Sequence, residues 1–584
     1  MRPPRSYRST RCSRAQMALV ERFEPSAQQR EIRDALEQSL IIIAPAGCGK
    51  TEALALRVAG LIEREVVRPP QRILLATFTN RSRENIAERV AHHVSPAVAA
   101  RTVTVQNLHG LSARIVQAHG NVVGLNSDWE PPAADWVLNQ CRQRKLSRAQ
   151  TDLVQEHLQQ AKLVTRTDVE VAEYLAQTGH TVAQEIEQQR VAEHRLTYDD
   201  LPRLADLVLR NALVADLYQH HFGYVIVDEF QDLTPQQASI LNRIALGRIT
   251  FAGDPAQGIY TFTGAEPETV LAAATASSDR VITFAESHRS SPAVLEAVNA
   301  LAPLTGGTPL ESSRPETWFG GGIAAHVEHA GYAEEASWVM SLSSRILARA
   351  PNHRIGVLGR VKARRSVLEN ALTSNAPFPW HRWDDPIFDS HVAPLLKSAV
   401  RRTTESELLA SEDLQSLLLS LVSPNELQDP GTREALIDAA DWVDDLVRSG
   451  ETVKSIAARI RAGESDTLLT APGVHLLTGH AGKGQQFDWV IVLGLEQGSI
   501  PFYRAVSQDA KREEARVLAV MLSRARHGVF TSQSLTESKP WEPYPVRARP
   551  SEFLPALVSS GAFSDWDTAR SWLNSVDWAA IRDR

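Results

Sequence analysis

The stretch APAGCGKTEA, residues 44–53, decides the fold because it has the spacing of a phosphate-binding loop. The apolar run LIII precedes it and LALRVAGLIE follows it, which predicts a strand, a loop of small residues and a helix. Small residues let backbone N–H groups point inward and hold phosphates at the positive end of the helix. A chance Gly-Lys-Thr turn is the alternative, and the flanking strand and helix argue against it.

The residues of this loop have separate predicted roles. Lys50 is placed to reach the outer phosphates, and the Thr51 hydroxyl is placed to bind Mg²⁺. Cys48 is interpreted as a small filler, although a thiol beside phosphates could be sensitive to redox state. We therefore expect ATP and Mg²⁺ as cofactors. The expected nucleotide-binding residues here are Ala46, Gly47, Cys48, Gly49, Lys50 and Thr51.

A second acidic motif completes the prediction of an ATPase site. YVIVDEFQD, residues 224–232, is an apolar run that ends in two carboxylates. A strand would deliver Asp228 and Glu229 at the sheet edge where α/β proteins bind ligands. Asp228 would then hold Mg²⁺, and Glu229 would orient or deprotonate the attacking water. An acidic pair on the surface after a strand is the alternative.

Composition limits the class of protein. The 584 residues predict several domains. A net charge of −7 offers no overall attraction for nucleic acid, so binding would need local patches. The cysteines Cys12, Cys48 and Cys141 are scattered, which predicts neither a metal cluster nor a disulfide framework and is typical of the cytoplasm. No apolar run approaches the ~18 residues of a membrane span, so we expect no membrane partner.

Strand-like runs alternate with helical patterns, which predicts an α/β fold with parallel sheets. SLIIIA, RILLATF, YVIVDEF and RITFAGD are the strand candidates of the first half, and RIGVLGR, VHLLTGH and DWVIVLG those of the second. The expected divisions are a disordered basic arm at 1–20 (with Met17 as an alternative start), a first domain at 21–275 with a helical insert at about 112–200, a second domain at 276–538 with a shorter helical insert at about 385–465, and a linker and tail at 539–584.

VDEFQD resembles the Walker B segment of superfamily 1 helicases of the UvrD/Rep/PcrA type. The resemblance continues in order along most of the chain, which makes it far more specific than any single motif. It is carried by QQREIRDAL (28–36), ILLATFTNRSRENIAERV (73–90), TVQNLHG (104–110), LTYDDLP (196–202), FAGDPAQGIYTFTGA (251–265), FAESHRSSP (284–292), LLTGHAGKGQQFDWVIVLGLEQGSIP (476–501) and KREEARVLAVMLSRAR (511–526).

The resemblance implies two RecA-like P-loop domains with ATP in the cleft between them. At matching positions, Gln29 would read adenine and Gln257 would sense the γ-phosphate. Arg289 and Arg524 would supply the positive charge that meets the developing charge on the γ-phosphoryl group. A surface ion pair is the alternative for each arginine.

The resemblance also implies a track for single-stranded DNA. Phe262 would stack on a base, with a place in the core as its alternative, and the same alternative applies to Phe78. The expected DNA-binding residues are Phe78, Thr79, Asn80, His109, Phe262, Thr478 and His480.

Several positions depart from the family pattern and put adenine selectivity and DNA affinity in doubt. Glu52 stands where the family usually has arginine. His288 stands where the family has the tyrosine that stacks on adenine, and it is still expected to bind the nucleotide. Gln485-Gln486-Phe487 replaces a motif with a carboxylate for the ribose. The Trp-rich tail is interpreted as a helix that docks a partner.

Two main functions remain open. The first is an ATP-dependent translocase or helicase that moves 3′→5′ on single-stranded or tailed duplex DNA, in repair, recombination or phage defence. The second is a DNA-responsive regulatory ATPase that signals to a partner nuclease and unwinds little. A repair protein is a further possible partner. An RNA-directed enzyme is a third function, with no specific support in the sequence.

Overall fold

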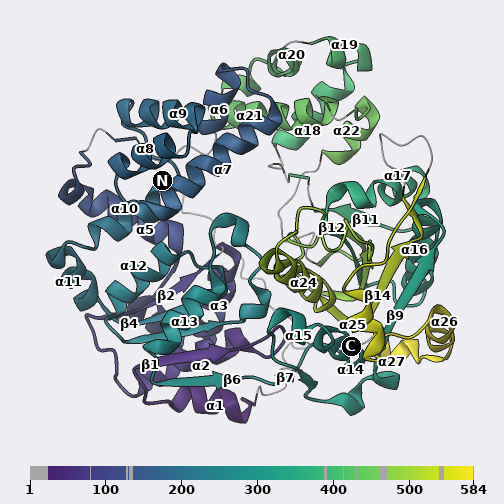
Figure 1. The fold of residues 1–584 in the computed structure, drawn as a ribbon, viewed down its shortest axis with the longest axis horizontal. Coiled ribbons are helices and arrows are strands. Elements are labelled where there is room, and N and C mark those ends of the chain that lie inside the picture. The colour runs from purple at the N-terminus through teal and green to yellow at the C-terminus, as the bar shows by residue number, and fades with distance from the viewer. Residues whose placement is uncertain are drawn as a thin grey trace, which may run out of the picture. The chain divides into compact units, whose positions relative to one another are not determined.

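The computed structural model describes residues 24–78, 80–126, 129–130, 136–383, 385–386, 388, 391–411, 413–428, 430–448, 450–460, 470–537 and 545–582. The predicted arm at 1–20, including Met17, lies outside them. The described chain divides into two compact units (Figure 1). The first unit contains the described residues of 1–44, 49–253 and 260–284, and the second those of 45–48, 254–259 and 285–584.

The first unit is built on a parallel sheet with the strand order β3-β2-β4-β5-β1-β6. Its strands are β1 (Ser39–Ile43), β2 (Arg72–Thr77), β3 (Val103–Asn107), β4 (Phe222–Asp228), β5 (Ile249–Gly253) and β6 (Arg280–Thr283). The four strands predicted for this half are confirmed as β1, β2, β4 and β5. The edge strands β3 and β6 were not among them, because they are short and only partly apolar. The first unit extends through β6 to residue 284, beyond the expected boundary at 275.

Helices bury the apolar faces of this sheet, as a parallel sheet requires. They are α1 (Ala27–Asp34), α2 (Lys50–Glu63), α3 (Asn80–Val94), α4 (Pro96–Thr102), α5 (Leu108–His119), α10 (Asp200–Val208), α11 (Ala212–His221), α12 (Pro235–Ala245) and α13 (Pro267–Ala276). Ile41 of β1, Leu74 of β2 and Val225 of β4 point into one core with α5 and α10 to α13. The carboxyl ends of the strands are thereby held in fixed register for the loops that follow them.

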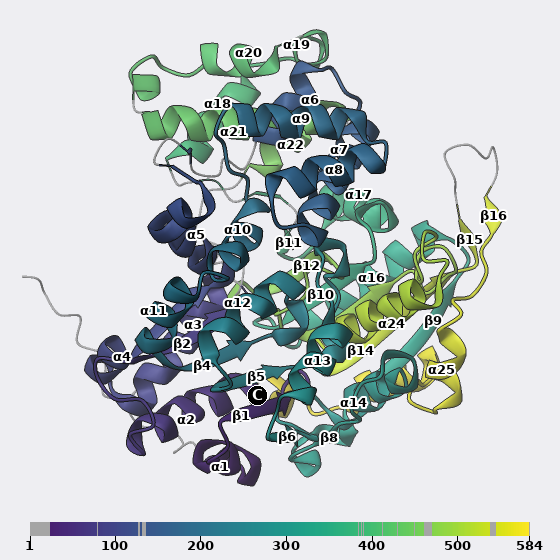
Figure 2. The ribbon, with the colours of Figure 1, turned by 60° about the vertical axis from the view of Figure 1, so that its left-hand side comes forward.

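The first helical insert has a core of its own. It contains α6 (Trp136–Gln143), α7 (Arg148–Val164), α8 (Asp168–Gln177) and α9 (Thr181–Ala192), which lie together in Figures 1 and 2. Trp136, Cys141, Leu158 and Val171 are buried in its apolar cluster. The described residues of this insert contribute no strand to either large sheet.

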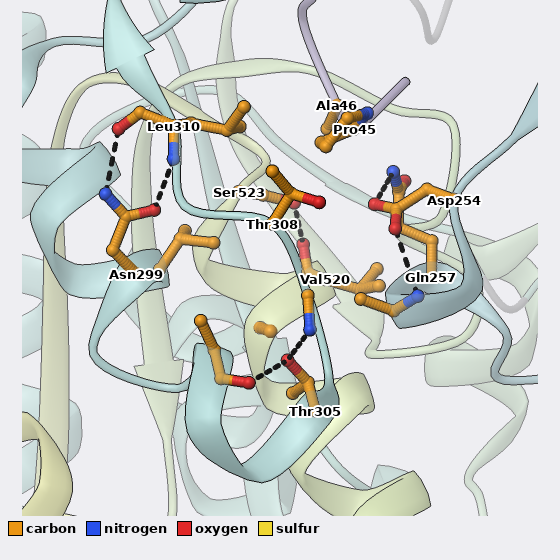
Figure 3. A pocket seen from close by; sticks show the side chains of 15 residues that line it. Pro45, Ala46, Asp254, Gln257, Asn299, Thr305, Thr308, Leu310, Val520 and Ser523 are labelled. Carbon is orange, nitrogen blue, oxygen red and sulfur yellow. Dashed lines mark hydrogen bonds between the residues drawn. The ribbon is translucent and has the colours of Figure 1, made fainter. Parts of the chain in front are cut away.

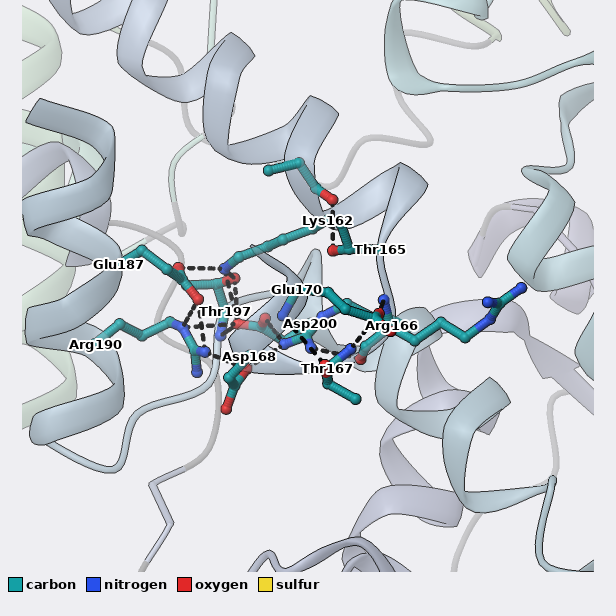
Figure 4. A network of polar contacts seen from close by, with 12 residues as sticks. Lys162, Thr165, Arg166, Thr167, Asp168, Glu170, Glu187, Arg190, Thr197 and Asp200 are labelled. Atoms are coloured by element: carbon teal, nitrogen blue, oxygen red, sulfur yellow. Dashed lines mark hydrogen bonds and ion pairs between the residues drawn. The ribbon is translucent and has the colours of Figure 1, made fainter. Parts of the chain in front are cut away.

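A buried network of charges ties the insert to α10 (Figure 4). Lys162 Nζ lies 3.0 Å from Asp200 Oδ2, and Arg203 Nη2 lies 2.6 Å from Asp200 Oδ1. Burial opposes the charge on Asp200, but Lys162, Arg190 and Arg203 hold its pKa well below the ordinary range. Opposite charges at these distances offset the cost of burying each ion. Asp168, Glu187 and Asp200 are near enough to share a metal ion, yet the three cations already neutralise them.

The second unit contains another parallel sheet, with the order β11-β12-β10-β13-β14-β9. Its strands are β9 (Ile323–His329), β10 (Arg354–Gly359), β11 (Trp380–Arg382), β12 (Gly473–Thr478), β13 (Phe487–Leu493) and β14 (Ala525–Ser534). The predicted strands RIGVLGR, VHLLTGH and DWVIVLG are confirmed as β10, β12 and β13. Two short pairs, β7 (Glu286–Ser287) with β8 (Glu311–Ser312) and β15 (Thr536–Glu537) with β16 (Val546–Arg547), complete the strands. The predicted α/β class with two parallel-sheet, RecA-like domains is confirmed.

The helices of the second unit fall into three groups. The sheet is covered by α14 (Pro292–Asn299), α15 (Ala302–Thr305), α16 (Tyr332–Leu347), α17 (Ser366–Asn375) and α24 (Gln508–Leu522). The second insert has its own apolar core and contains α18 (Val392–Arg401), α19 (Glu405–Ala410), α20 (Leu414–Ser420), α21 (Pro430–Arg448) and α22 (Val453–Arg459). The tail contains α25 (Leu554–Ser559), α26 (Trp566–Ser575) and α27 (Trp578–Arg582). Among the described helices, none is both long and apolar enough to cross a bilayer.

The tail corrects one interpretation of the sequence. Its tryptophans suggested a helix that docks a partner, but Trp566, Trp572 and Trp578 pack against the core of the second sheet. The rings of Trp572 and Trp578 lie 6.2 Å and 5.7 Å from the buried ring of Trp489. Aromatic residues bury more apolar surface than other side chains, so the tail stabilises its own domain with them.

Candidate nucleotide and single-strand sites

Glycine at Gly47 and Gly49 gives the phosphate loop its shape. Both have a positive φ, 87° and 79°, which is strained for other residues. The Gly47 carbonyl accepts a 2.9 Å hydrogen bond from the backbone N–H of His288. A Cβ at Gly47 would lie 2.7 Å from Cβ of Arg289, so only glycine fits there. The structure thus brings three of the predicted nucleotide-site residues together in the second unit.

Lys50 lies between the two predicted catalytic carboxylates of the first unit. It begins α2, while Asp228 ends β4 and Glu229 follows with a positive φ of 61°. Lys50 Nζ lies 2.9 Å from Asp228 Oδ1 and 2.5 Å from Glu229 Oε2. Gln231 Nε2 also donates to Glu229 Oε2, at 2.6 Å. Loop, strand and turn therefore converge at the carboxyl end of β4, where the sequence predicted them.

Burial and charge set the protonation of this cluster in opposite directions. Burial works against the ammonium of Lys50, but Asp228 and Glu229 hold its pKa above the ordinary value. Burial raises the pKa of Asp228, against the pull of Lys50. The hydroxyl of Thr51 and the carboxylate of Asp228 are hard oxygen donors of the kind that Mg²⁺ prefers. The donor set fits the predicted metal.

The predicted adenine reader, Gln29, makes contacts within the first unit. Its side chain is only 3% exposed. Its Oε1 accepts from the backbone N–H of Ser26 at 2.9 Å, as part of a capping box, and its Nε2 donates to the Gly49 carbonyl at 3.3 Å. Both ends of the amide are engaged in this way. Gln29 therefore supports the phosphate loop in this conformation.

Cys48 is packed as an inert filler. Its side chain is fully buried, and burial raises the pKa of its thiol to about 12. The thiolate is the reactive form, so a buried thiol with a raised pKa resists oxidation. Both features favour the interpretation of Cys48 as a small filler over redox sensitivity.

Two predicted residues of the second unit, Gln257 and Arg524, contact each other directly. Arg524 Nη2 donates to Gln257 Oε1 at 3.2 Å, and Gln257 Nε2 donates to Asp254 Oδ2 at 2.8 Å. Figure 3 shows Asp254 and Gln257 at a cavity of about 40 Å³ that Ser523 also lines. Lys483 Nζ donates to the Gln257 carbonyl at 2.8 Å, a contact that sequence reasoning missed.

Aromatic side chains gather beyond the nucleotide cluster of the first unit. Phe78 stacks on Tyr260 with ring centroids 5.6 Å apart, and Tyr260 meets Phe262 edge to face at 5.9 Å. Phe262 is 62% exposed, which favours base stacking over a place in the core. Tyr260 was not predicted, although an aromatic residue two positions before Phe262 was a signal for it.

The other predicted DNA-binding residues belong to several elements of the two units. His109 lies in the first turn of α5, and its ring meets the exposed Tyr198 edge to face. Burial lowers the pKa of His109, although the nearby Asp199 acts to raise it. Thr478 ends β12 in the second unit. Burial lowers the pKa of His480 to about 4. Thr79 lies outside the described residues, and Asn80 begins α3.

Comparisons with known families agree with this geometry. Residues 26–277 match the UvrD/REP helicase N-terminal domain, and residues 436–536 match the UvrD-like helicase C-terminal domain. Together these matches cover more than half of the chain. The chain belongs to the UvrD/Rep-like superfamily 1 helicases. The resemblance seen in the sequence is confirmed, and with it the class of ATP-dependent DNA helicases.

Individual relatives of this UvrD/Rep-like helicase are distant but cover most of its length. The ATP-dependent DNA helicase UvrD2 of Mycobacterium tuberculosis is 27% identical over 88% of this chain and 79% of its own. The ATP-dependent DNA helicase PcrA of Leuconostoc citreum is 24% identical over 87% and 82%. The putative ATP-dependent DNA helicase YjcD of Bacillus subtilis is 24% identical over 85% and 77%.

One departure from the family pattern has a clear place in this UvrD/Rep-like helicase. Glu52, which stands where arginine is usual, turns to α3 and pairs there with Arg89 and His93. A negative side chain at this position therefore has partners within the first unit.

Proposed function

We propose that this protein is an ATP-driven translocase on single-stranded DNA that moves 3′→5′ and unwinds tailed duplexes. The observation that carries the proposal is the cluster of Lys50, Asp228 and Glu229 at the carboxyl end of β4. It combines a phosphate-binding cation with two carboxylates of separate roles. The aromatic set of Phe78, Tyr260 and Phe262 in the same unit supports DNA as the polymer.

Each residue of the cluster has a chemical task in this proposal. Lys50 neutralises the outer phosphates, and Thr51 with Asp228 would hold Mg²⁺, which offsets the charge on the β- and γ-phosphates when bound. Glu229 orients the attacking water and accepts its proton. Lys50 pairs with both carboxylates, so a bound phosphate would compete with them for its ammonium. Glu229 thereby becomes available as a base when phosphate is present.

In this proposal, hydrolysis drives motion because residues of both units would act on the same nucleotide, as the family resemblance implies. The first unit holds Lys50 and Glu229, and the second holds Gln257, Arg289 and Arg524. Positive charge supplied to the γ-phosphoryl group is worth most in the transition state. A reaction that needs residues from two domains links their movement to ATP turnover.

The test combines ATPase rates with strand displacement. We expect single-stranded DNA to stimulate hydrolysis and 3′-tailed duplexes to unwind faster than 5′-tailed ones, with Lys50→Ala as the inactive control. A rate of hydrolysis that does not change when single-stranded DNA is added would contradict the assignment of DNA as the substrate. Faster unwinding of 5′-tailed duplexes would reverse the proposed polarity.

A DNA-responsive regulatory ATPase with a partner nuclease, as in phage defence, is the second candidate. It is favoured by the small second insert, α18 to α22, and by the altered base and ribose positions such as His288 and Gln486. Strong stimulation of hydrolysis by DNA without any strand displacement would select it. Genes that neighbour this one would then distinguish repair from defence.

A further inference from the structure

Glu52 is a buried carboxylate one residue beyond the phosphate-binding Thr51. It occupies the first turn of α2 and is 8% exposed. Its Oε2 accepts from Arg89 Nη1 at 2.7 Å, and its Oε1 lies 2.5 Å from His93 Nε2. Arg89 and His93 stand four residues apart on α3, so they lie on one face of that helix. The carboxylate therefore bridges two helices.

Local helix energetics do not account for this arrangement. An acidic residue in the first turn complements the helix dipole wherever its side chain points. Burial of the carboxylate, however, costs free energy unless cations or donors satisfy it. Here the partners come from one other helix, so the compensation depends on the position of α3 relative to α2.

The two bridged helices begin at two different predicted sites. The first residues of α2 are Lys50 and Thr51, of the nucleotide site. α3 begins at Asn80, two residues after Phe78, which stacks on Tyr260. A shift of either helix along its axis would stretch the contacts of Glu52, because helices transmit displacements as rigid elements.

We propose that Glu52 is a positioning residue that couples nucleotide binding at the start of α2 to single-strand binding at the start of α3. The proposal rests on the proposed DNA-stimulated ATP hydrolysis. The Arg89–Glu52 pair and the His93 contact hold the two helix starts in one arrangement, so occupancy of one site favours the conformation that binds at the other. This coupling is reciprocal, as linkage requires.

The experiment measures the affinity of the full chain for oligo-dT with and without a non-hydrolysable ATP analogue. The ratio of the two dissociation constants is the coupling factor. The variants are Glu52→Gln, Arg89→Gln and the double variant, with Glu88→Gln as the control because Glu88 is exposed on the same helix. Arg89→Gln keeps the charge of Glu52 in the first turn of α2, and Arg89 is 52% exposed, so this variant tests the pairing with little risk to folding.

We expect each single variant to lower the coupling factor by about twofold to fivefold, the range of a half-exposed ion pair. The coupling factor of the double variant should be no lower than that of Glu52→Gln alone, since the two residues act as a pair. The basal rate of hydrolysis should stay near the wild-type value in every variant. The coupling factor of the Glu88→Gln control should also stay near the wild-type value.

An unchanged coupling factor in Arg89→Gln and Glu52→Gln would overturn the inference. If the affinities for oligo-dT with and without the ATP analogue fell by the same factor and the melting temperature fell too, the role of Glu52 would be purely structural. That result would also overturn the inference. If the wild-type chain itself bound no single strand, the proposed function would fail instead.

Discussion

Arg524 donates a 3.2 Å hydrogen bond from Nη2 to Oε1 of Gln257, which joins the end of α24 to the turn that follows β5. Arg524 is only 3% exposed, and its Nε donates to the Val520 carbonyl at 2.9 Å. Its guanidinium is therefore held in one orientation. Because Gln257 also bonds to Asp254, the predicted phosphate sensor and the predicted catalytic arginine form one connected group within the second unit.

Arg524→Ala should lower kcat by about 10³-fold or more, as expected for loss of an arginine that stabilises phosphoryl transfer. Nucleotide affinity should change little, because the charge matters most in the transition state. Steady-state ATPase kinetics and equilibrium binding of an ATP analogue would measure the two effects.

Arg524→Lys is the matched variant because it keeps the charge but cannot reproduce the planar group that reaches both Gln257 and the Val520 carbonyl. The kcat of Arg524→Lys should remain well below that of the wild type. If Arg524→Ala lost nucleotide binding while turnover at saturation stayed normal, Arg524 would be a ligand of the ground state.

Glu229→Gln should slow turnover by at least ~10²-fold, the scale of lost general-base catalysis. The amide can still approach Lys50 but cannot accept a proton from water. Binding of ATP and Mg²⁺ should persist, and single-turnover hydrolysis with a separate binding assay would show it. Turnover near wild type would refute the assignment of the base.

Phe262→Ala should weaken binding of oligo-dT by about 1–3 kcal/mol, the contribution of one stacked base. Basal hydrolysis should stay nearly unchanged, while stimulation by DNA should fall. Fluorescence anisotropy at several salt concentrations would measure the binding constant. Its logarithm should fall with the logarithm of salt concentration at a similar slope in the wild type and in Phe262→Ala, since the phosphate contacts are unchanged.

Phe262→Trp should restore affinity, and Phe319→Ala is the control because Phe319 is an exposed aromatic residue of the second unit. Unchanged affinity and stimulation in Phe262→Ala would place the stacking platform elsewhere, with Tyr260 as the next residue to test.

Gln29→Ala should raise KM for ATP and GTP by similar factors. Gln29 donates to the Gly49 carbonyl and so supports the phosphate loop, which serves every nucleoside triphosphate. KM values for both nucleotides would be compared in the wild type and the variant. A loss confined to ATP would show instead that Gln29 leaves the loop and reads adenine in the bound state.

Acidification should destabilise the protein through histidines that partial burial keeps neutral. Burial lowers the pKa of His326 to about 4, against an ordinary value of 6.5. Between pH 6.5 and about 4, His326 binds a proton in the unfolded chain but stays neutral in the folded chain. The free energy of unfolding therefore falls as the pH drops from 6.5 towards 4, by about 1.4 kcal/mol per pH unit for one such group.

His326→Asn should reduce this dependence, because it removes the titrating ring and can retain the contact with the Thr531 hydroxyl. Melting temperatures between pH 7.5 and 4.5 would measure the difference, with His220→Asn as an exposed control. An identical pH profile for His326→Asn and wild type would contradict the assignment.

Much of the site could be predicted from local sequence. The phosphate loop, Asp228 and Glu229 follow apolar runs that form strands, and parallel strands bring their carboxyl ends to one edge. The edge strands β3 and β6 were missed because their side chains are partly exposed and their pattern is weak. β9 and β14 were also missed, although both are largely buried.

The sequence by itself determined the α/β class, the phosphate loop and the order of the helicase motifs, because hydrophobic period and motif spacing are local properties. Only the tertiary structure decided which distant side chains meet. Arg524 and Gln257 are 267 residues apart, and Glu52 and Arg89 are 37 apart. The same holds for Tyr260 against Phe78 and for the tail tryptophans around Trp489. Such contacts depend on how separate elements pack, which no local pattern encodes.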